Sequence, residues 1–334
     1  MCLVCGAFAF VIGLISGYPV GAKIVSEFRE KGLVSKDEGE RLLCFTNNSG
    51  PLFILSSVGI ALFGDTKTGL LLLCTHILAC ISVGIIFGII SKKSRKNNLV
   101  GINSFKKSES YNDNSKFNSQ KNINFKNLGE VLTNSINSSI STILMIGGFI
   151  VIFSVIISIL NQTNILNKLS TIFYPLLKLF NFDIDFAKPL LSGILELTNG
   201  INQVASINTK LISQNIVLSA FLLGFGGFSV LLQVYSIISK TDLSIKVYLK
   251  GKLLQGIIAS IYTFFAFKFL PFFNLDIIQA NSLLYNPTNI SNTNNIFASS
   301  YSFFYSFGIF IITIILIFLI LKIFNNLYLR IKDF

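Results

Sequence analysis

The residues of this chain that could do chemistry are polar side chains placed inside long apolar stretches. Glu196 is the only acidic residue in the run from Lys188 to Val204. A carboxylate inside a bilayer is costly, so an acid there is a functional candidate. It would bind a coupling proton or cation, or pair with a base such as Lys23 or Lys252. The alternative is a carboxylate at a helix end, level with the lipid headgroups.

Two other apolar segments are interrupted in the middle. The stretch Cys44–Leu62 is broken by Thr46-Asn47-Asn48-Ser49-Gly50-Pro51, and the stretch Leu211–Ile238 by Gly224-Phe225-Gly226-Gly227-Phe228-Ser229. A helix broken inside a bilayer leaves backbone groups unpaired, which hydrocarbon penalises heavily. Such breaks are tolerated where protein or a water-filled cavity covers them, and in transporters they mark the substrate site. The sequence therefore predicts a membrane carrier.

The polar run after Thr46 and the half-helix starting at Pro51 would present backbone N–H groups and a positive dipole end, which suits an anionic or polar ligand. Gln233 lies one turn beyond Ser229 on the same helical face. For the glycines, close helix packing is the alternative. The predicted substrate-binding residues are Thr46, Asn47, Asn48, Ser49, Glu196, Asn199, Gly226, Gly227, Ser229 and Gln233.

A second irregularity precedes each broken segment, at residues 13–23 and 193–200. In both, apolar residues run into a break of small residues and then turn back. Pro19 suits the first turn of a new helix, where its missing N–H is not needed. We expect two re-entrant hairpins, with Gly17, Tyr18, Pro19 and Gly21 forming the first turn and Gly200 the second. A kinked ordinary helix is the alternative.

Composition supports a membrane protein: 52% of residues are apolar, 13% are charged, and the mean hydropathy is +0.68. Four stretches are long enough to cross a bilayer: Gly69–Ile90, Ile140–Leu160, Leu253–Leu270 and Phe303–Leu321. The net charge of +12 sits mostly in loops beside these spans, as the positive-inside rule expects, so nucleic acid is not a predicted partner. The lipid bilayer is the predicted partner.

No motif in the sequence predicts an enzyme, a metal site or a cofactor. The only histidine, His76, lies inside a span, where a hydrogen-bonded structural role is favoured over a proton relay. The five cysteines lie in apolar segments, and we predict no disulfide. Ser35 and Glu38 have the spacing of a capping box at a helix start.

The pattern of breaks, hairpins and spans repeats along the chain with an offset of 179 residues. The first span ends at a basic loop and the second at an uncharged one, so the two copies are predicted to have opposite orientations. The predicted fold class is an all-α polytopic membrane protein with two inverted-topology repeats, each containing a re-entrant hairpin, a broken helix and a full transmembrane helix.

The predicted organisation is a first repeat (1–90), a disordered basic cytoplasmic loop (91–128), a second repeat (129–270), an extracytoplasmic loop (271–302) and an additional transmembrane helix with a basic tail (303–334). The second repeat has a span before its hairpin and the first does not. We therefore expect a missing N-terminal segment of about one span, roughly 20 residues plus connections.

Four motifs resemble one family: residues 14–23 (LISGYPVGAK), 41–53 (RLLCFTNNSGPLF), 196–200 (ELTNG) and 224–233 (GFGGFSVLLQ). They are similar to the YlbJ family of sporulation integral membrane proteins, also called stage V sporulation protein V, in the nucleoside-transporter/FeoB gate superfamily. The resemblance covers about residues 6–269. It agrees with a missing N-terminal part.

The resemblance implies a non-enzymatic transporter in the mother cell of an endospore-forming bacterium. It would move dipicolinate, a small planar dianion, across the outer forespore membrane and support formation of the spore cortex. Homo-oligomers or other sporulation membrane proteins are the implied protein partners. The alternatives are a gate-type transporter of a nucleoside or ion, and a non-transporting sporulation scaffold that uses the loop 91–126.

Overall fold

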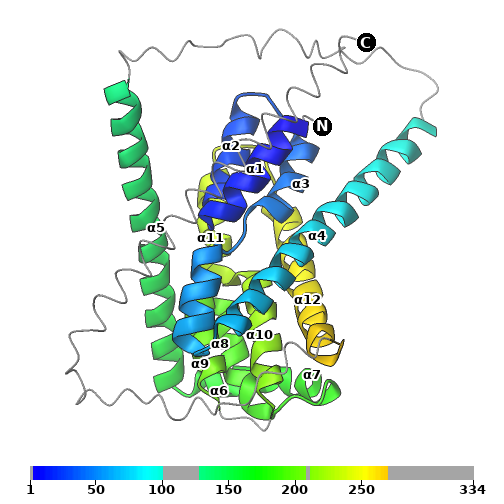
Figure 1. Ribbon diagram of the computed structural model, residues 1–334. Helices are drawn as coiled ribbons and strands as arrows, with labels where there is room; N and C mark the ends of the chain where they lie inside the picture. Colours follow the sequence, from blue (N-terminus) through cyan, green and yellow to red (C-terminus); the bar gives the residue numbers. More distant parts are fainter. Residues whose placement is uncertain (1–2, 101–127, 208–210, 270–334) are drawn as a thin grey trace. The chain divides into compact units, whose positions relative to one another are not determined.

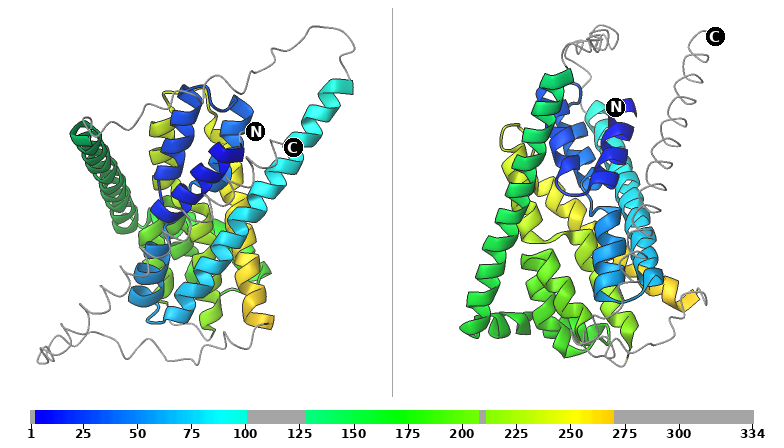
Figure 2. Two further views of the ribbon diagram at one scale, coloured as in Figure 1. Left: turned by 45° about the horizontal axis from the view of Figure 1, so that its top comes forward. Right: turned by 60° about the vertical axis from the view of Figure 1, so that its left-hand side comes forward.

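The computed structural model describes residues 3–100, 128–207 and 211–269, all within the first of two units, Met1–Ile278 (Figures 1 and 2). Every regular element in these ranges is helical, which confirms the all-α class. Most of the predicted basic loop (101–127), the predicted extracytoplasmic loop (271–302) and the predicted last helix with its tail (303–334) lie outside the described residues.

The first half of the chain contains α1 (Leu3–Ser16), α2 (Val20–Glu30), α3 (Lys36–Thr46), η1 (Phe53–Leu62) and α4 (Thr66–Val100). α1 and α2 form a helical hairpin, with Pro19 directly before α2. α3 begins with the predicted capping box between Ser35 and Glu38. The loop was expected to begin directly after Ile90. α4 instead continues for ten more residues, to Val100, with its backbone groups paired within the helix.

η1 is a π-helix, a wider coil than the α-helix that the sequence predicts for this stretch. The N–H of Phe63 accordingly reaches back five residues to the carbonyl of Val58 at 3.1 Å. π-helical turns are rare and occur mostly at functional sites. Hydrophobic periodicity cannot reveal such a turn, because a single apolar run fits either coil.

The second half contains α5 (Leu128–Gln162), α6 (Ile165–Ser170), η3 (Thr171–Phe173), α7 (Tyr174–Leu179), η4 (Ile184–Phe186), α8 (Ala187–Leu195), α9 (Leu197–Ala205), α10 (Ile212–Phe225), α11 (Gly227–Ile238) and α12 (Ile245–Phe269). α8 and α9 form a second hairpin. α10 packs along α12, and α12 along α4 (Figures 1 and 2). These contacts bring the two halves of the chain together.

Helix boundaries in the two halves share the offset of 179 residues. α1 and α8 end at Ser16 and Leu195, α3 and α10 end at Thr46 and Phe225, and α4 and α12 begin at Thr66 and Ile245. The order of elements is also the same: hairpin, interrupted helix, long helix. The breaks and turns that repeat in the sequence therefore correspond to helix ends that repeat in the structure.

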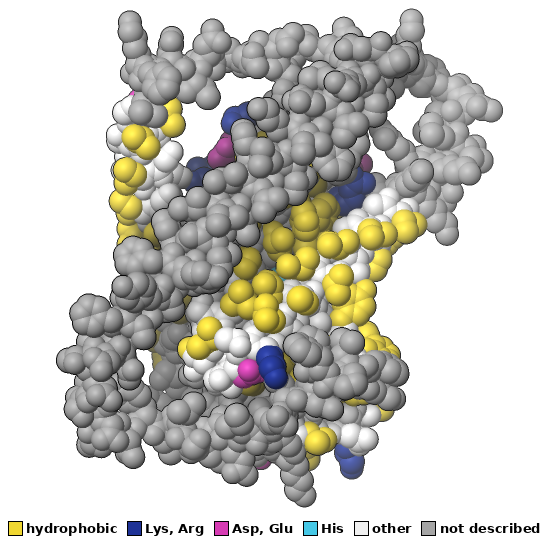
Figure 3. Space-filling model, viewed as in Figure 1, with side chains coloured by type: hydrophobic (Ala, Val, Ile, Leu, Met, Phe, Trp, Pro, Cys, Tyr) yellow, Lys and Arg dark blue, Asp and Glu magenta, His cyan; other side chains and the backbone are white. Residues whose placement is uncertain are grey.

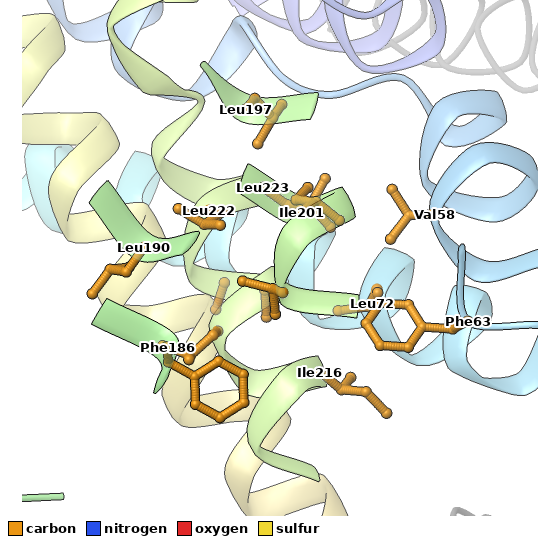
Figure 4. Packing of buried hydrophobic residues seen from close by; sticks show 14 of the residues in the cluster. Val58, Phe63, Leu72, Phe186, Leu190, Leu197, Ile201, Ile216, Leu222 and Leu223 are labelled. Carbon is orange, nitrogen blue, oxygen red and sulfur yellow. The ribbon is translucent and has the colours of Figure 1, made fainter. Parts of the chain in front are cut away.

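The apolar core has two parts. One cluster gathers side chains of η1, α4, α8, α9 and α10, including Val58, Leu72, Leu190 and Ile201 (Figure 4). The other joins α1, α2 and α3 to α11 and the start of α12. Tyr18, in the turn of the first hairpin, packs against both clusters. It therefore lies at the junction of the two halves.

Three described stretches are long and apolar enough to cross a membrane: Thr66–Ile90, Gly129–Gln162 and Ser213–Ile238. The predicted span at Leu253–Leu270 lies in α12, which is not among these three; Lys246, Lys250 and Lys252 make the start of that helix more polar. Large apolar side chains are exposed along α4 and α5, where Figure 3 shows hydrophobic surface. Such surface is what a lipid-facing helix presents.

Candidate functional site

The first helix break spans Asn47 to Gly50, between the end of α3 and the helical turn that leads into η1. The side chains of Asn47 and Asn48 are completely buried. Asn47 donates from Nδ2 to the hydroxyl of Tyr248 at 2.9 Å, and its Oδ1 accepts the N–H of Ala22 at 3.4 Å. Asn48 donates from Nδ2 to the carbonyl of Phe45 at 2.7 Å. The amides therefore replace the backbone pairing that the break removes.

Three polar side chains of α12 complete this network. Lys252 donates from Nζ to the backbone carbonyl of Asn47 at 2.9 Å and to Oε1 of Gln255 at 2.7 Å. Gln255 donates from Nε2 to Oδ1 of Asn48 at 2.8 Å. Tyr248 is the third member, through its bond with Asn47. α12 thus stabilises the first break through hydrogen bonds between residues about 200 positions apart in the sequence.

The second break is much shorter than expected. α10 ends at Phe225 and α11 begins at Gly227, so Gly226 alone separates them. Gly226 and Gly227 have φ angles of +86° and +80°, which L-residues with a side chain rarely adopt. The break therefore rests on backbone freedom at two consecutive glycines, whereas Gly224 and Ser229 remain helical.

In the described structure, buried oxygen atoms without a hydrogen-bond partner lie beside both breaks: the hydroxyls of Thr46 and Ser49 at the first, and two side chains on α11 at the second. Within the described part of the chain, the hydroxyl of Ser229 and Oε1 of Gln233 have no hydrogen-bond partner, although both residues are 1% exposed. A buried polar atom without a partner is uncommon and needs an explanation, such as a water, an ion or a ligand. These two positions keep unused acceptors beside the second break.

The first hairpin packs against both breaks. A Cβ at Gly21 would lie 2.2 Å from the carbonyl oxygen of Thr46, and one at Gly17 would lie 2.9 Å from the N of Gly50. Tyr18 donates its hydroxyl to the carbonyl of Leu223 at 3.3 Å, just before the second break. Only glycine permits the approach to the first break, and Tyr18 links that region to the second.

The second hairpin turns at Glu196. Its side chain caps the N-terminus of α9: Oε1 accepts the N–H of Thr198 at 3.0 Å, and Oε2 accepts the N–H of Asn199 at 2.8 Å and the Thr198 hydroxyl at 2.6 Å. The carboxylate is 1% exposed. It faces neither base that the sequence suggested, because Lys23 bonds to Ser138 and Lys252 to the first break. The helix N-terminus satisfies this charge instead.

Gly200 permits a close approach within the second hairpin, whereas Gly21 permits the approach of the first hairpin to the first break. A Cβ at Gly200 would lie 2.0 Å from the Cα of Gly193, on the facing helix of the hairpin. At the second break, a Cβ at Gly227 would meet the carbonyl oxygen of Gly193 at 3.0 Å and the N of Leu197 at 3.3 Å. The second hairpin and the second break are thus in direct backbone contact.

A cleft of about 340 Å³ lies between η1 and α9. It is lined by Phe53, Ser57, Ala61, Leu62, Thr198, Asn199, Ile201 and Asn202. η1 follows the first break and α9 follows the second hairpin's turn, so the cleft joins the two halves of the chain. Of the predicted substrate-binding residues, Asn199 lines it. The others are packed among helices, and no cationic side chain lines this cleft.

His76 is 1% exposed, and neither of its ring nitrogens has a hydrogen-bond partner among the described residues. The expected hydrogen-bonded structural histidine is thus not what the structure shows. Gln255, which corresponds to His76 at the repeat offset, bonds to Lys252 and Asn48 instead. The described residues contain no group of three His, Cys, Asp or Glu side chains arranged to hold a metal ion.

Lys252, Gln255 and Tyr248 are site residues that the sequence interpretation left out. Lys252 was considered only as a partner for Glu196. The signal that could have found it is its own position, since it directly precedes a stretch of its helix without charged residues, from Leu253 to Phe267. An intramembrane lysine is a functional candidate in the same way as an intramembrane acid.

Comparisons with known proteins also indicate a membrane protein. Residues 143–241 match the Gate family, described as nucleoside recognition. The sporulation integral membrane protein YlbJ of Bacillus subtilis (strain 168) is 34% identical over 267 residues. That match covers 79% of this chain and 64% of the relative, so the chain spans a little less than two thirds of the length of that protein. No solved structure matches. The resemblance read from the motifs is thereby confirmed: the chain is similar to the sporulation integral membrane protein YlbJ, and part of it matches the Gate family.

Proposed function

We propose that this chain is a sporulation-associated membrane carrier that moves a small polar metabolite, with dipicolinate as its first candidate cargo. Its location would be the mother-cell cytoplasmic membrane and the outer forespore membrane. The similarity to YlbJ and the match to the Gate family support the sporulation role and the carrier class. The cargo and the compartment are proposed, and uptake of radiolabelled compounds tests the cargo.

The carrier would be built from two inverted repeats. The shared offset of the helix ends supports the repeat. The loop that follows the first long helix is basic and the one that follows the second has no Lys or Arg, which supports the inversion. In such carriers one repeat moves against the other around a site near the bilayer midplane. The hairpins α1–α2 and α8–α9 would then be re-entrant, and Tyr18 would lie close to the centre of the movement.

The single observation that carries the proposal is the cleft between η1 and α9. It is formed where the half-helix after the first break faces the hairpin that turns at Glu196. Its lining offers hydroxyl and amide groups from Ser57, Thr198, Asn199 and Asn202 beside apolar surface from Phe53 and Ile201. A few polar groups in a mostly apolar lining are typical of small-molecule sites. A flat aromatic cargo fits this chemistry.

A nucleoside is the second candidate cargo, and the lining of the cleft favours it. Amides and hydroxyls can hydrogen-bond a base and a sugar, and no Lys or Arg in the lining is present to balance a dianion. The description of the Gate family points to the same class. Dipicolinate would instead draw its counter-charge from Lys252 or from half-helix N-termini that come into reach in another state of the carrier.

Uptake into proteoliposomes tests both candidates. Radiolabelled dipicolinate and a radiolabelled nucleoside are compared for the wild type and for the variants Ser57→Ala and Asn202→Ala. Both side chains are exposed in the cleft. Gln203→Ala, one residue further along α9 and outside the cleft lining, is the matched control. We expect each cleft variant to lower uptake of the true cargo several-fold, since a lost hydrogen bond is worth about 1 kcal/mol.

Uptake of neither compound by the wild type would overturn the proposed cargoes. Uptake of one compound with equal rates in all three variants would leave the carrier class in place but remove the cleft as its site. The intramembrane acid and the break have their own variants, Glu196→Gln and Asn48→Ala. Unchanged transport in both would remove these two residues from the site.

A further inference from the structure

Lys252 is the only buried Lys or Arg among the side chains that the structure describes. All of its contacts are neutral: the carbonyl of Asn47 at 2.9 Å, Oε1 of Gln255 at 2.7 Å, and the ring face of Tyr18, whose centroid lies 5.2 Å from Nζ. No ion pair joins it to a carboxylate in the described ranges. The only buried acid there, Glu196, is held by the N-terminus of α9.

The position of the ammonium group is as informative as its burial. Asn47 directly follows Thr46, the last residue of α3. The last carbonyls of a helix lack intrahelical partners and carry a partial negative charge. In transporters with broken helices, unwound carbonyls and half-helix C-terminal ends are the groups that coordinate Na⁺ or H⁺. Lys252 therefore places a covalently attached cation where a free coupling cation would bind.

The second break provides an internal comparison. At the repeat offset, the position equivalent to Lys252 is Leu73 on α4, which is apolar. The end of α10 is closed differently, because the N–H of Gly226, in the left-handed conformation, donates to the carbonyl of Leu222 at 2.8 Å. The charge is thus a property of the first break and not a general requirement of this architecture.

We propose that Lys252 takes the place of a coupling cation at the first helix break. The break is then occupied by the ammonium group of the chain itself, no Na⁺ binds there, and transport proceeds without a Na⁺ gradient. The part of this proposal that concerns transport rests on the proposed function. The part that concerns cation binding does not, and it can be measured without any cargo.

Thermal unfolding of the full chain in detergent tests cation binding, with sodium chloride and choline chloride compared at equal ionic strength. The variants are Lys252→Ala, which opens space beside the Asn47 carbonyl, and Lys252→Arg, which keeps the charge. Lys250→Ala is the matched control, because Lys250 lies on the same helix and is exposed.

We expect the Tm of the wild type, of Lys252→Arg and of Lys250→Ala to be the same in both salts. Lys252→Ala should lose about 5 °C or more in choline and regain part of this loss in sodium. A wild type stabilised specifically by sodium would overturn the proposal, and this measurement stands even if Lys252→Ala does not fold. A loss in Lys252→Ala that sodium does not restore would assign the lysine to folding alone and would also overturn it.

Uptake in sodium-free medium tests the consequence for transport. Equal uptake of the cargo with and without sodium is the expected result. Uptake that requires sodium would contradict the inference while leaving the proposed function intact. Absence of uptake in both media would contradict the proposed function, and the unfolding experiment would still decide the inference.

Discussion

The two helix breaks of this chain solve the same problem by different means. At the first, side chains from α12 replace the missing backbone bonds, and the amides of Asn47 and Asn48 each find partners. At the second, consecutive left-handed glycines close the helix end through the backbone. Ser229 and Gln233, just beyond it, keep buried oxygen atoms without partners in the described structure.

Paired and unpaired buried polar groups have different consequences at the two breaks. A fully hydrogen-bonded buried network is rigid, because each member is costly to separate from its partners. Unpaired buried oxygens have the opposite property, since a water, ion or ligand that reaches them is favoured. We therefore expect the bonds of Asn47 and Asn48 to α12 to be a fixed part of the fold. The unpaired oxygens, at Thr46 and Ser49 beside the first break and at Ser229 and Gln233 beside the second, should be the groups that respond to a ligand.

The largest effect is expected where the first hairpin touches the first break. In Gly21→Val the new Cβ would lie 2.2 Å from the Thr46 carbonyl oxygen, a backbone atom that cannot move aside without shifting the break. We expect the free energy of unfolding in detergent to fall by about 3 kcal/mol or more. Gly88→Val on α4 is the matched control, because a Cβ there meets nothing within 4 Å. Equal losses in the two variants would show that the close approach is not needed.

A smaller effect is expected from the network itself. Asn48→Leu keeps most of the volume but leaves Nε2 of buried Gln255 without the Asn48 acceptor, and the carbonyl of Phe45 keeps only the thiol of Cys80 as a donor. We expect a loss of about 2–3 kcal/mol, measured by the same unfolding assay. Asn134→Leu, at an exposed position on α5, is the control. If the two substitutions proved equally mild, the first break would not depend on its side-chain bonds.

At the second break the expectation is reversed. Ser229→Ala removes a hydroxyl that has no partner in the described structure, so the free energy of unfolding should change by no more than about 0.5 kcal/mol. Cargo uptake should nevertheless fall, because the unused acceptor is where a ligand or its water would bind. Ser206→Ala, at the exposed residue that directly follows α9, controls for general effects of the substitution on transport. Normal uptake with normal stability would remove Ser229 from the site.

Much of the fold could be predicted because its signals are local. Glycine, proline and polar residues inside apolar runs marked both breaks and both hairpin turns, and the Ser35–Glu38 capping box marked a helix start. The length of the second break could not be predicted, because Gly224 is compatible with a helix or with a turn. Which glycine leaves the helix depends on tertiary contacts such as that between Gly227 and Gly193.

The site was harder to predict than the fold. Glu196 was identified as an intramembrane acid, but its partner is the N-terminus of its own next helix, a local cap that its spacing to Thr198 and Asn199 could have suggested. The bonds of Lys252 and Gln255 to the first break join residues about 205 positions apart. One sequence contains no information on such pairings. The cleft likewise depends on how η1 faces α9.

The smallest effect is expected at the periphery, where Arg29 on α2 pairs with Asp242 in the turn before α12, with Nε–Oδ1 and Nη2–Oδ2 distances of 2.8 and 2.9 Å. The hydrogen bond from Arg29 holds the pKa of the Asp242 carboxyl below its ordinary value. A carboxyl whose pKa is lower in the folded state stabilises that state at pH values above its unfolded pKa of about 3.9. This stabilisation is lost as the pH falls through the folded pKa.

Asp242→Asn should therefore lower the Tm slightly at neutral pH, and the difference from the wild type should vanish in acid. High salt should shrink it at neutral pH, because the pair is exposed. A difference that is constant from neutral to acid pH would show that this contact between the two halves does not depend on charge, unlike the network at the first break.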